Sequence, residues 1–220
     1  MKLLLTSAGI KNKSIYQALL DLCGKPIDQC RALAITTSSY ALKEGSQRAY
    51  EFIVGKSETP MCELNWKSLG ILELSALPSL NQEDWIEDVK NADVILVNGG
   101  DPLYLSYWMK TSGVADLLPY IKAVYVGLSA GSMIMADRIG SDFIGWNKYH
   151  LSDETLGFVN FSIFPHLNHP LLPDNNLENA QKWYKEIVHQ AFAIDDETAI
   201  KVSDDKVEII SEGQWFALNN

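Results

Sequence analysis

The sequence predicts an α/β fold in which a mostly parallel central sheet is covered by helices on both faces. Short apolar runs alternate with segments of helical periodicity over the first two thirds of the chain, which is typical of βαβ units. The apolar runs are nearly continuous, as expected for strands that are buried on both faces. The chain has 220 residues, and we expect residues 1–220 to form a single domain.

Five apolar runs are the predicted strands of this sheet, at residues 3–5, 32–35, 70–74, 94–97 and 123–126. Helices are predicted between them, with an apolar stripe at 15–22, a helix at 44–54 and another at 83–90. Residues 79–82 have the form of a capping box before the last of these. The final third is less regular: a strand-like run at 159–164 precedes a helix at 175–190. Alternating runs near 199–202, 206–210 and 214–218 predict a small antiparallel edge or hairpin.

Composition excludes several classes of protein. The net charge of −10 argues against a nucleic-acid-binding surface or an anionic-membrane-binding surface, and no Lys/Arg cluster offsets it. The N-terminal apolar run is too short for a signal peptide, and no run elsewhere is long enough to span a bilayer. The three cysteines lack metal-type spacing, so we expect them to be reduced and buried. A cytoplasmic location is the expectation that follows.

The most informative stretch is residues 123–137, AVYVGLSAGSMIMAD. A buried strand leads into Gly127-Leu128-Ser129-Ala130-Gly131, and a helix follows. This is the context in which a G-x-S-x-G pattern indicates a nucleophile elbow, with the Ser129 hydroxyl raised above the sheet edge. The Ala130 N–H would then hold an oxyanion. The alternative interpretation is an ordinary tight turn between a strand and a helix.

A nucleophilic serine needs a base, and histidine suits neutral pH. His166 is the preferred base, because a proline and a strand-like run before it would place its ring rigidly at a strand end. His150 stays open as an alternative, whereas His189 is expected at a surface or helix end. His166 and His169 also have the spacing of a metal-binding pair, although no acidic third ligand lies close by in the sequence. A structural histidine is the remaining alternative.

The acid that orients the imidazole is expected in the cluster Asp195-Asp196-Glu197, just before an apolar run. Asp137 and Asp142 are rivals, since they follow the nucleophile helix closely. The Gly99-Gly100 pair ends a strand, so the Gly100 N–H is a second candidate for the oxyanion hole. The polar ends of three strands, at 6–9, 98–101 and 127–129, are expected to meet at one edge of the sheet.

Four motifs together resemble the peptidase E / cyanophycinase family of serine peptidases. They occur in order along the chain: Gly99-Gly100-Asp101-Pro102, Gly127-Leu128-Ser129-Ala130-Gly131-Ser132, Pro165-His166-Leu167-Asn168 and Asp196-Glu197-Thr198-Ala199. The resemblance implies a three-layer, flavodoxin-like sandwich similar to class I glutamine amidotransferases. It also implies Ser129 as nucleophile, His166 as general base, Glu197 as orienting acid, and an oxyanion hole from the Gly100 and Ala130 backbone. No metal or cofactor is implied.

The expected activity is hydrolysis of small peptides through an acyl-enzyme, as a dipeptidase or oligopeptidase. The aspartyl dipeptidases of this family bind the substrate's aspartate with an arginine after the histidine, but residues 171–190 contain no arginine. The resemblance therefore does not extend to strict Asp-X specificity. Two alternatives stay open: an α/β-hydrolase-type esterase, and a non-catalytic relative that binds a small molecule or protein. Of partners, we expect a small peptide substrate, no nucleic acid and no membrane, with a homodimer as a prior only.

Overall fold

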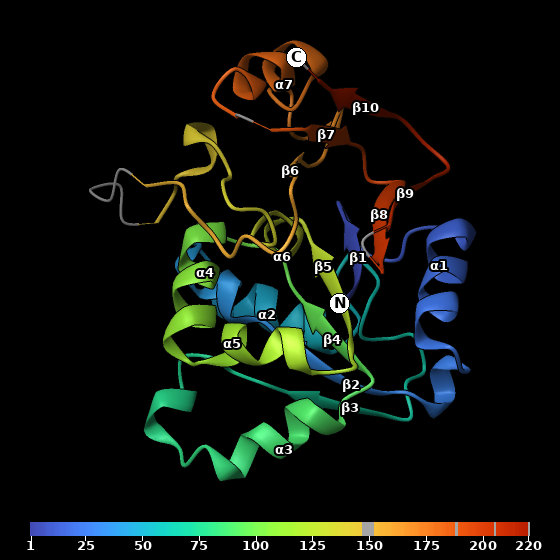
Figure 1. Ribbon diagram of the computed structural model, residues 1–220, viewed down its shortest axis with the longest axis vertical. Helices are drawn as coiled ribbons and strands as arrows, with labels where there is room; N and C mark the ends of the chain where they lie inside the picture. The colour runs from blue at the N-terminus through green and yellow to red at the C-terminus, as the bar shows by residue number, and fades with distance from the viewer. Residues whose placement is uncertain (147–151, 188, 205, 220) are drawn as a thin grey trace.

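The computed structural model describes residues 1–146, 152–187, 189–204 and 206–219 of the chain. A seven-stranded sheet lies at the centre, in the order β3-β2-β4-β5-β1-β8-β9 (Figure 1). Its first five strands are parallel, β8 is antiparallel to β1, and β9 is antiparallel to β8. Its strands are β1 (Lys2–Thr6), β2 (Arg31–Ile35), β3 (Ser68–Ile71), β4 (Val94–Val97), β5 (Val124–Leu128), β8 (Thr198–Ser203) and β9 (Lys206–Ser211). The predicted α/β fold with a mostly parallel sheet is confirmed.

Helices cover both faces of this sheet. Because neighbouring residues of a strand point to opposite faces, each strand contributes side chains to both of these layers. Leu4 of β1 belongs to the core cluster on one face, together with residues of α1 and α2, whereas Leu3 and Leu5 belong to the cluster on the other face, together with residues of α3, α4 and α5. The helices are α1 (Lys13–Cys23), α2 (Gly45–Ile53), α3 (Glu83–Asn91), α4 (Pro102–Thr111), α5 (Val114–Leu117), α6 (Ala130–Met133) and α7 (Leu177–Tyr184). Because both faces are covered, the strands are apolar throughout.

A second, three-stranded sheet lies above the first in Figure 1 and carries α7. It is formed by β6 (Ser162–Phe164), β7 (Ala191–Ile194) and β10 (Trp215–Leu218), with β6 parallel and β10 antiparallel to β7. Trp183 of α7 is buried against this sheet beside Phe164. The chain passes from β7 directly into β8, so residues 195–197 form the turn that joins the two sheets.

Several predicted elements differ in extent from the observed ones. The helix predicted at 175–190 is limited to Leu177–Tyr184, and the strand predicted at 159–164 to Ser162–Phe164. The capping box at 79–82 is wrong, because α3 has no side-chain N-cap and Ser79 ends a 3₁₀ turn instead. Strand β7 was not predicted from the sequence, since its four residues, AFAI, are too short and apolar to distinguish from a loop or helix end.

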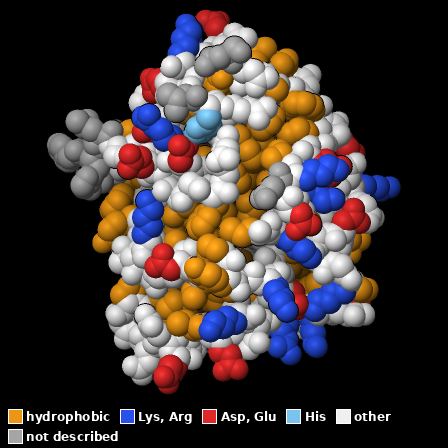
Figure 2. Space-filling view, in the orientation of Figure 1, with side chains coloured by type: hydrophobic (Ala, Val, Ile, Leu, Met, Phe, Trp, Pro, Cys, Tyr) orange, Lys and Arg blue, Asp and Glu red, His pale blue; other side chains and the backbone are white. Residues whose placement is uncertain are grey.

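The outer surface carries charges of both signs. On the face drawn in Figure 2, acidic and basic side chains are interspersed around hydrophobic side chains near the middle of the view. Within the described residues, no helix combines the length and apolar character needed to cross a membrane.

Candidate active site

Ser129 occupies a strained turn between β5 and α6. Its backbone has φ 48° and ψ −111°, a combination that L-residues rarely adopt, which is typical of a nucleophile elbow. The turn closes tightly because it lacks side chains at two positions. A Cβ at Gly127 would lie 2.6 Å from the Gly131 carbonyl oxygen, and one at Gly131 would lie 2.5 Å from the Val97 carbonyl oxygen.

Hydrogen bonds from β1 fix this turn to the sheet edge. The Thr6 carbonyl accepts the Ser129 N–H at 3.0 Å and the Ser132 hydroxyl at 2.7 Å, and the Thr6 hydroxyl donates to the Gly127 carbonyl at 2.8 Å. Strands β4, β5 and β1 are neighbours, with Val97 in register with Gly127 and Thr6 in register with Leu128. The three polar strand ends expected at one edge therefore do meet there.

His166 reaches Ser129 from the second sheet. It follows β6 after one proline, and its Nε2 lies 2.9 Å from the Ser129 Oγ. Its backbone is left-handed, with φ 55°. The Asn175 side chain donates to the Pro165 carbonyl at 3.0 Å, and the Leu167 N–H donates to the Ile194 carbonyl at 3.0 Å. The structure thus brings together the serine and histidine that the sequence analysis paired.

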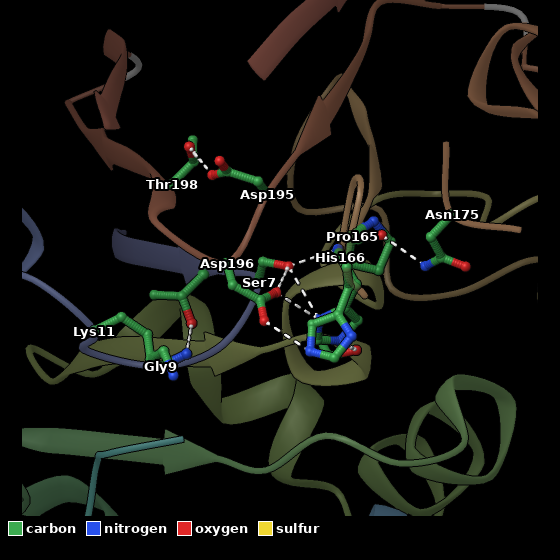
Figure 3. A network of polar contacts seen from close by, with 12 residues as sticks. Ser7, Gly9, Lys11, Pro165, His166, Asn175, Asp195, Asp196 and Thr198 are labelled. Atoms are coloured by element: carbon green, nitrogen blue, oxygen red, sulfur yellow. Dashed lines mark hydrogen bonds and ion pairs between the residues drawn. The ribbon is translucent and has the colours of Figure 1, made fainter. Parts of the chain in front are cut away.

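The carboxylate beside His166 belongs to Asp196, and not to Glu197 as the sequence analysis expected. Asp196 Oδ1 lies 2.7 Å from His166 Nδ1 (Figure 3). Glu197 turns away to α1, where its Oε2 accepts the Asn12 side-chain N–H at 3.0 Å. Asp195 points away from the histidine in Figure 3 and accepts the Thr198 hydroxyl at 2.7 Å.

The reason for this difference is the tight turn between β7 and β8. The Asp195 carboxylate accepts the Glu197 N–H at 3.1 Å, which is a side-chain-closed turn of the kind that aspartate favours. Asn12 caps α1 through its Oδ1 and binds both the carbonyl and the carboxylate of Glu197 through its Nδ2. These contacts leave Asp196 alone facing the histidine.

The rival residues lie elsewhere. Asp137 contacts His189, with 3.3 Å between Oδ1 and Nε2, and His189 also lies 3.0 Å from the Ser162 hydroxyl. Asp142 lines a separate cavity beside α7. His150 lies outside the described residues.

His169 lies on the other side of the same carboxylate, with its Nε2 3.5 Å from Asp196 Oδ2. Its Nδ1 accepts the Leu171 N–H at 3.1 Å, so a neutral His169 carries its proton on the nitrogen that faces Asp196. Among the described residues, no group of three or more His, Cys, Asp or Glu side chains is arranged to hold a metal ion.

Asp196 is partly buried, and its neighbours decide its charge. Burial is the largest influence on its pKa and acts to raise it. The hydrogen bond from His166, the charges of His166 and His169, and the hydrogen bond from Ser7 together outweigh burial and hold the pKa of Asp196 below its ordinary value. The carboxylate is therefore ionised at neutral pH and suited to accept the imidazole N–H.

The sequence analysis named the backbone N–H groups of Gly100 and Ala130 as candidates for an oxyanion hole. Gly100 lines the same cleft as Ser129, and Ala130 follows Ser129 directly in the chain. Within the described residues, neither the Gly100 N–H nor the Ala130 N–H has a hydrogen-bond partner. Gly100 has φ 151°, and a Cβ there would collide with the Ser38 carbonyl, so only glycine fits. The Ser38 hydroxyl donates to the Gly99 carbonyl at 2.8 Å and fixes this loop.

A cleft of about 470 Å³ opens in front of Ser129 and His166. Gly99, Gly100 and Leu128 line it on one side, and α2 lines it with Arg48 and Glu51. Among the described residues, the Arg48 guanidinium has no ion-pair or hydrogen-bond partner, and it is the one Lys or Arg side chain in the cleft wall. The sequence analysis missed Arg48, because nothing local connects residue 48 with residue 129.

Comparisons with known proteins agree with this fold. The family model for peptidase family S51 matches residues 3–210. A candidate peptidase E protein from Listeria monocytogenes EGD-e has a similar structure, with a TM-score of 0.68, 19% identity, and coverage of 96% of this chain and 98% of that one. A peptidase from an acI-B1 Actinobacterium has a TM-score of 0.60 and 20% identity, with coverage of 99% of this chain and 93% of that one. No curated protein sequence matches the chain.

Proposed function

Because the chain belongs to peptidase family S51 and is a serine peptidase, we propose that Ser129, His166 and Asp196 form its catalytic triad. The observation that carries this proposal is the continuous contact from hydroxyl to imidazole to carboxylate. The Ser129 Oγ lies 2.9 Å from His166 Nε2, and His166 Nδ1 lies 2.7 Å from Asp196 Oδ1. These are hydrogen-bond distances, and the order of groups is that of an activated serine.

In the proposed reaction, the Ser129 Oγ attacks a peptide carbonyl while His166 Nε2 takes the hydroxyl proton. The Gly100 and Ala130 N–H groups stabilise the oxyanion that forms. His166 then gives its proton to the leaving amine, and a water activated by the same nitrogen hydrolyses the acyl-enzyme. The ionised Asp196 holds the imidazole tautomer and stabilises the imidazolium.

We propose small peptides, including dipeptides and tripeptides, as substrates. The cleft volume of about 470 Å³ suits a short ligand. The Arg48 guanidinium is available to bind a carboxylate of such a peptide, which a short peptide carries at its C-terminus and in any acidic side chain. Strict specificity for an N-terminal aspartate is not part of the proposal, because residues 171–190 lack the arginine that would recognise it.

The esterase alternative is less well supported, because an α/β-hydrolase has its acid before its histidine in the chain and Asp196 follows His166. The remaining alternative, a non-catalytic binding protein, predicts that the wild type neither cleaves peptides nor reacts with a fluorophosphonate.

The test is hydrolysis of a mixed dipeptide and tripeptide library by the wild-type protein and by Ser129→Ala, with products identified by mass spectrometry. We expect cleavage products with the wild type alone, and labelling of Ser129 by a fluorophosphonate. Including peptides with amidated C-termini and peptides without acidic side chains separates the two sources of a carboxylate. Absence of both cleavage and labelling in the wild type would contradict the proposal and favour a binding protein.

A further inference from the structure

One polar group beside the proposed triad has no place in the reaction as described. Ser7 follows β1 directly and is completely buried, at 0% exposure. Strand β1 lies next to β5, so Ser7 stands beside the elbow that carries Ser129. Its hydroxyl lies between the His166 segment and the turn that carries Asp196 (Figure 3).

The contacts of this hydroxyl fix the direction of its hydrogen bonds. The Ser7 Oγ lies 2.7 Å from the His166 backbone N, 3.2 Å from Asp196 Oδ1 and 3.4 Å from His166 Nδ1. The backbone N–H can only donate, so Ser7 accepts there. Its single hydrogen then goes to the carboxylate, since the Nδ1 proton is already directed at Asp196 Oδ1.

This pair of bonds ties the backbone of one triad member to the side chain of another. The bond to the backbone matters because His166 is left-handed, at φ 55°, and such a conformation is unfavourable for a residue other than glycine. A conformation of that kind persists only where its surroundings hold it. The Ser7 hydroxyl holds it at the residue whose ring must meet Ser129.

Two neighbouring hydroxyls provide a contrast. Thr6 at the end of β1 and Ser132 of α6 are also fully buried, but both hydroxyls donate to backbone carbonyls, of Gly127 and Thr6 respectively. Of these three hydroxyls, Ser7 is the one that contacts the proposed triad. Its contacts therefore suggest a role in the alignment of the triad rather than in the closing of the elbow alone.

We propose that Ser7 is a positioning residue of the active site, which holds the His166 backbone and the Asp196 carboxylate in the alignment that activates Ser129. The proposal rests on the proposed function. Because a misplacement of about 1 Å at a catalytic group costs roughly 10²-fold in rate, loss of this hydroxyl acts on turnover and not on substrate binding.

The experiment compares Ser7→Ala with the wild type on a peptide that the wild type cleaves. We expect kcat to fall about 10- to 100-fold, with KM within about 3-fold. The rate of Ser129 labelling by a fluorophosphonate should fall by a similar factor, although the hydroxyl of Ser129 is unchanged. Ser7→Cys, which retains a weak donor and acceptor of similar size, should give an intermediate kcat.

The matched control is Ser112→Ala, which also removes one buried hydroxyl, at the end of α4, where it donates to the Met109 carbonyl at 3.3 Å. Ser112→Ala should retain the wild-type kcat. A kcat for Ser7→Ala equal to that of Ser112→Ala would overturn the proposal, whether both are normal or both reduced. If Ser7→Ala does not fold, Ser7→Cys decides: normal kcat in that variant also overturns it.

A second readout is the imidazole Nδ1–H resonance of His166 in proton NMR. We expect its chemical shift to change in Ser7→Ala and to stay unchanged in Ser112→Ala. Failure of the proposed function has a different signature, since the wild type itself would then neither cleave peptides nor react with the fluorophosphonate.

Discussion

The elbow around Ser129 and the turn from Asp195 to Glu197 both place side chains at the site, but by different physical means. The elbow is recognisable within five residues, because Gly127 and Gly131 permit the close backbone approach that the strained Ser129 requires, and Thr6 of the neighbouring strand then fixes it to the sheet. The turn has three adjacent carboxylates, and contacts far along the chain decide where each one points. Asn12 binds Glu197, and Gln214 donates its backbone N–H to Asp195.

This difference explains which catalytic residues a local pattern can identify. A strand, a small-residue turn and a helix define the position of a nucleophile. A carboxylate at the junction of two sheets is selected by partners that no local spacing reveals. Substitutions in the elbow and substitutions in the turn should therefore have different kinds of effect on the protein.

The largest effect is expected where the two regions meet. His166→Ala removes the base that connects the elbow to the turn, and kcat should fall roughly 10⁴- to 10⁶-fold. The measurement is steady-state hydrolysis of a peptide that the wild type cleaves. His189→Ala is the control, because His189 contacts Ser162 and Asp137 away from Ser129, and it should retain activity within about 3-fold. Equal losses in the two variants would contradict the assignment.

The next largest effect is expected in the turn from Asp195 to Glu197, where a substitution can remove the hydrogen bonds that close the turn. Asp195→Ala removes the acceptor for the Glu197 N–H and the Thr198 hydroxyl. We expect the free energy of unfolding to fall by about 1–3 kcal/mol, and kcat to fall about 10- to 100-fold as Asp196 loses its alignment. Urea unfolding and peptide hydrolysis measure the two quantities. Asp88→Ala, an exposed carboxylate of α3, should change neither; a stable but inactive Asp195→Ala would indicate a direct catalytic role instead.

Substitutions in a third region, the part of the cleft wall that α2 forms, should affect substrate binding more than the chemical step. Arg48→Met removes the guanidinium proposed to bind a substrate carboxylate, and kcat/KM should fall about 10- to 100-fold, mainly through KM. Arg48→Lys should recover only part of the loss, since lysine lacks the bidentate fork. Lys43→Met, a cation outside the cleft wall, serves as the control. The prediction is wrong if KM for carboxylate-bearing peptides is unchanged in Arg48→Met.

The smallest effect concerns pH and stability. The pKa of Asp196 is lowered in the folded protein, so its carboxylate stabilises the fold at pH values above its unfolded pKa of about 3.9. This contribution is lost as the pH falls through the lower, folded pKa. The stability difference between wild type and Asp196→Asn, measured by urea unfolding, should therefore be larger at neutral pH than at about pH 3. A difference that does not change with pH would contradict the lowered pKa.

Much of the fold followed from local patterns, because buried parallel strands leave unmistakable apolar runs. Residues 94–97 were predicted with the observed bounds, and the elbow and its histidine partner were paired correctly in space. Strand β7 and the identity of the carboxylate were not predicted. Both depend on the second sheet, whose short strands are paired with segments distant in the sequence. Arg48 and Ser7 join the site for the same reason, through tertiary contacts alone.

The assignment of the acid is tested most directly by the kcat of Asp196→Asn beside that of Glu197→Gln, on the same peptide. Both changes remove one negative charge from adjacent residues of the same turn, so each controls for the other. We expect Asp196→Asn to lose roughly 10⁴-fold, because the imidazole tautomer is no longer held, and Glu197→Gln to stay within about 3-fold of the wild type. A large loss in Glu197→Gln with near-normal turnover in Asp196→Asn would contradict the Ser129–His166–Asp196 triad.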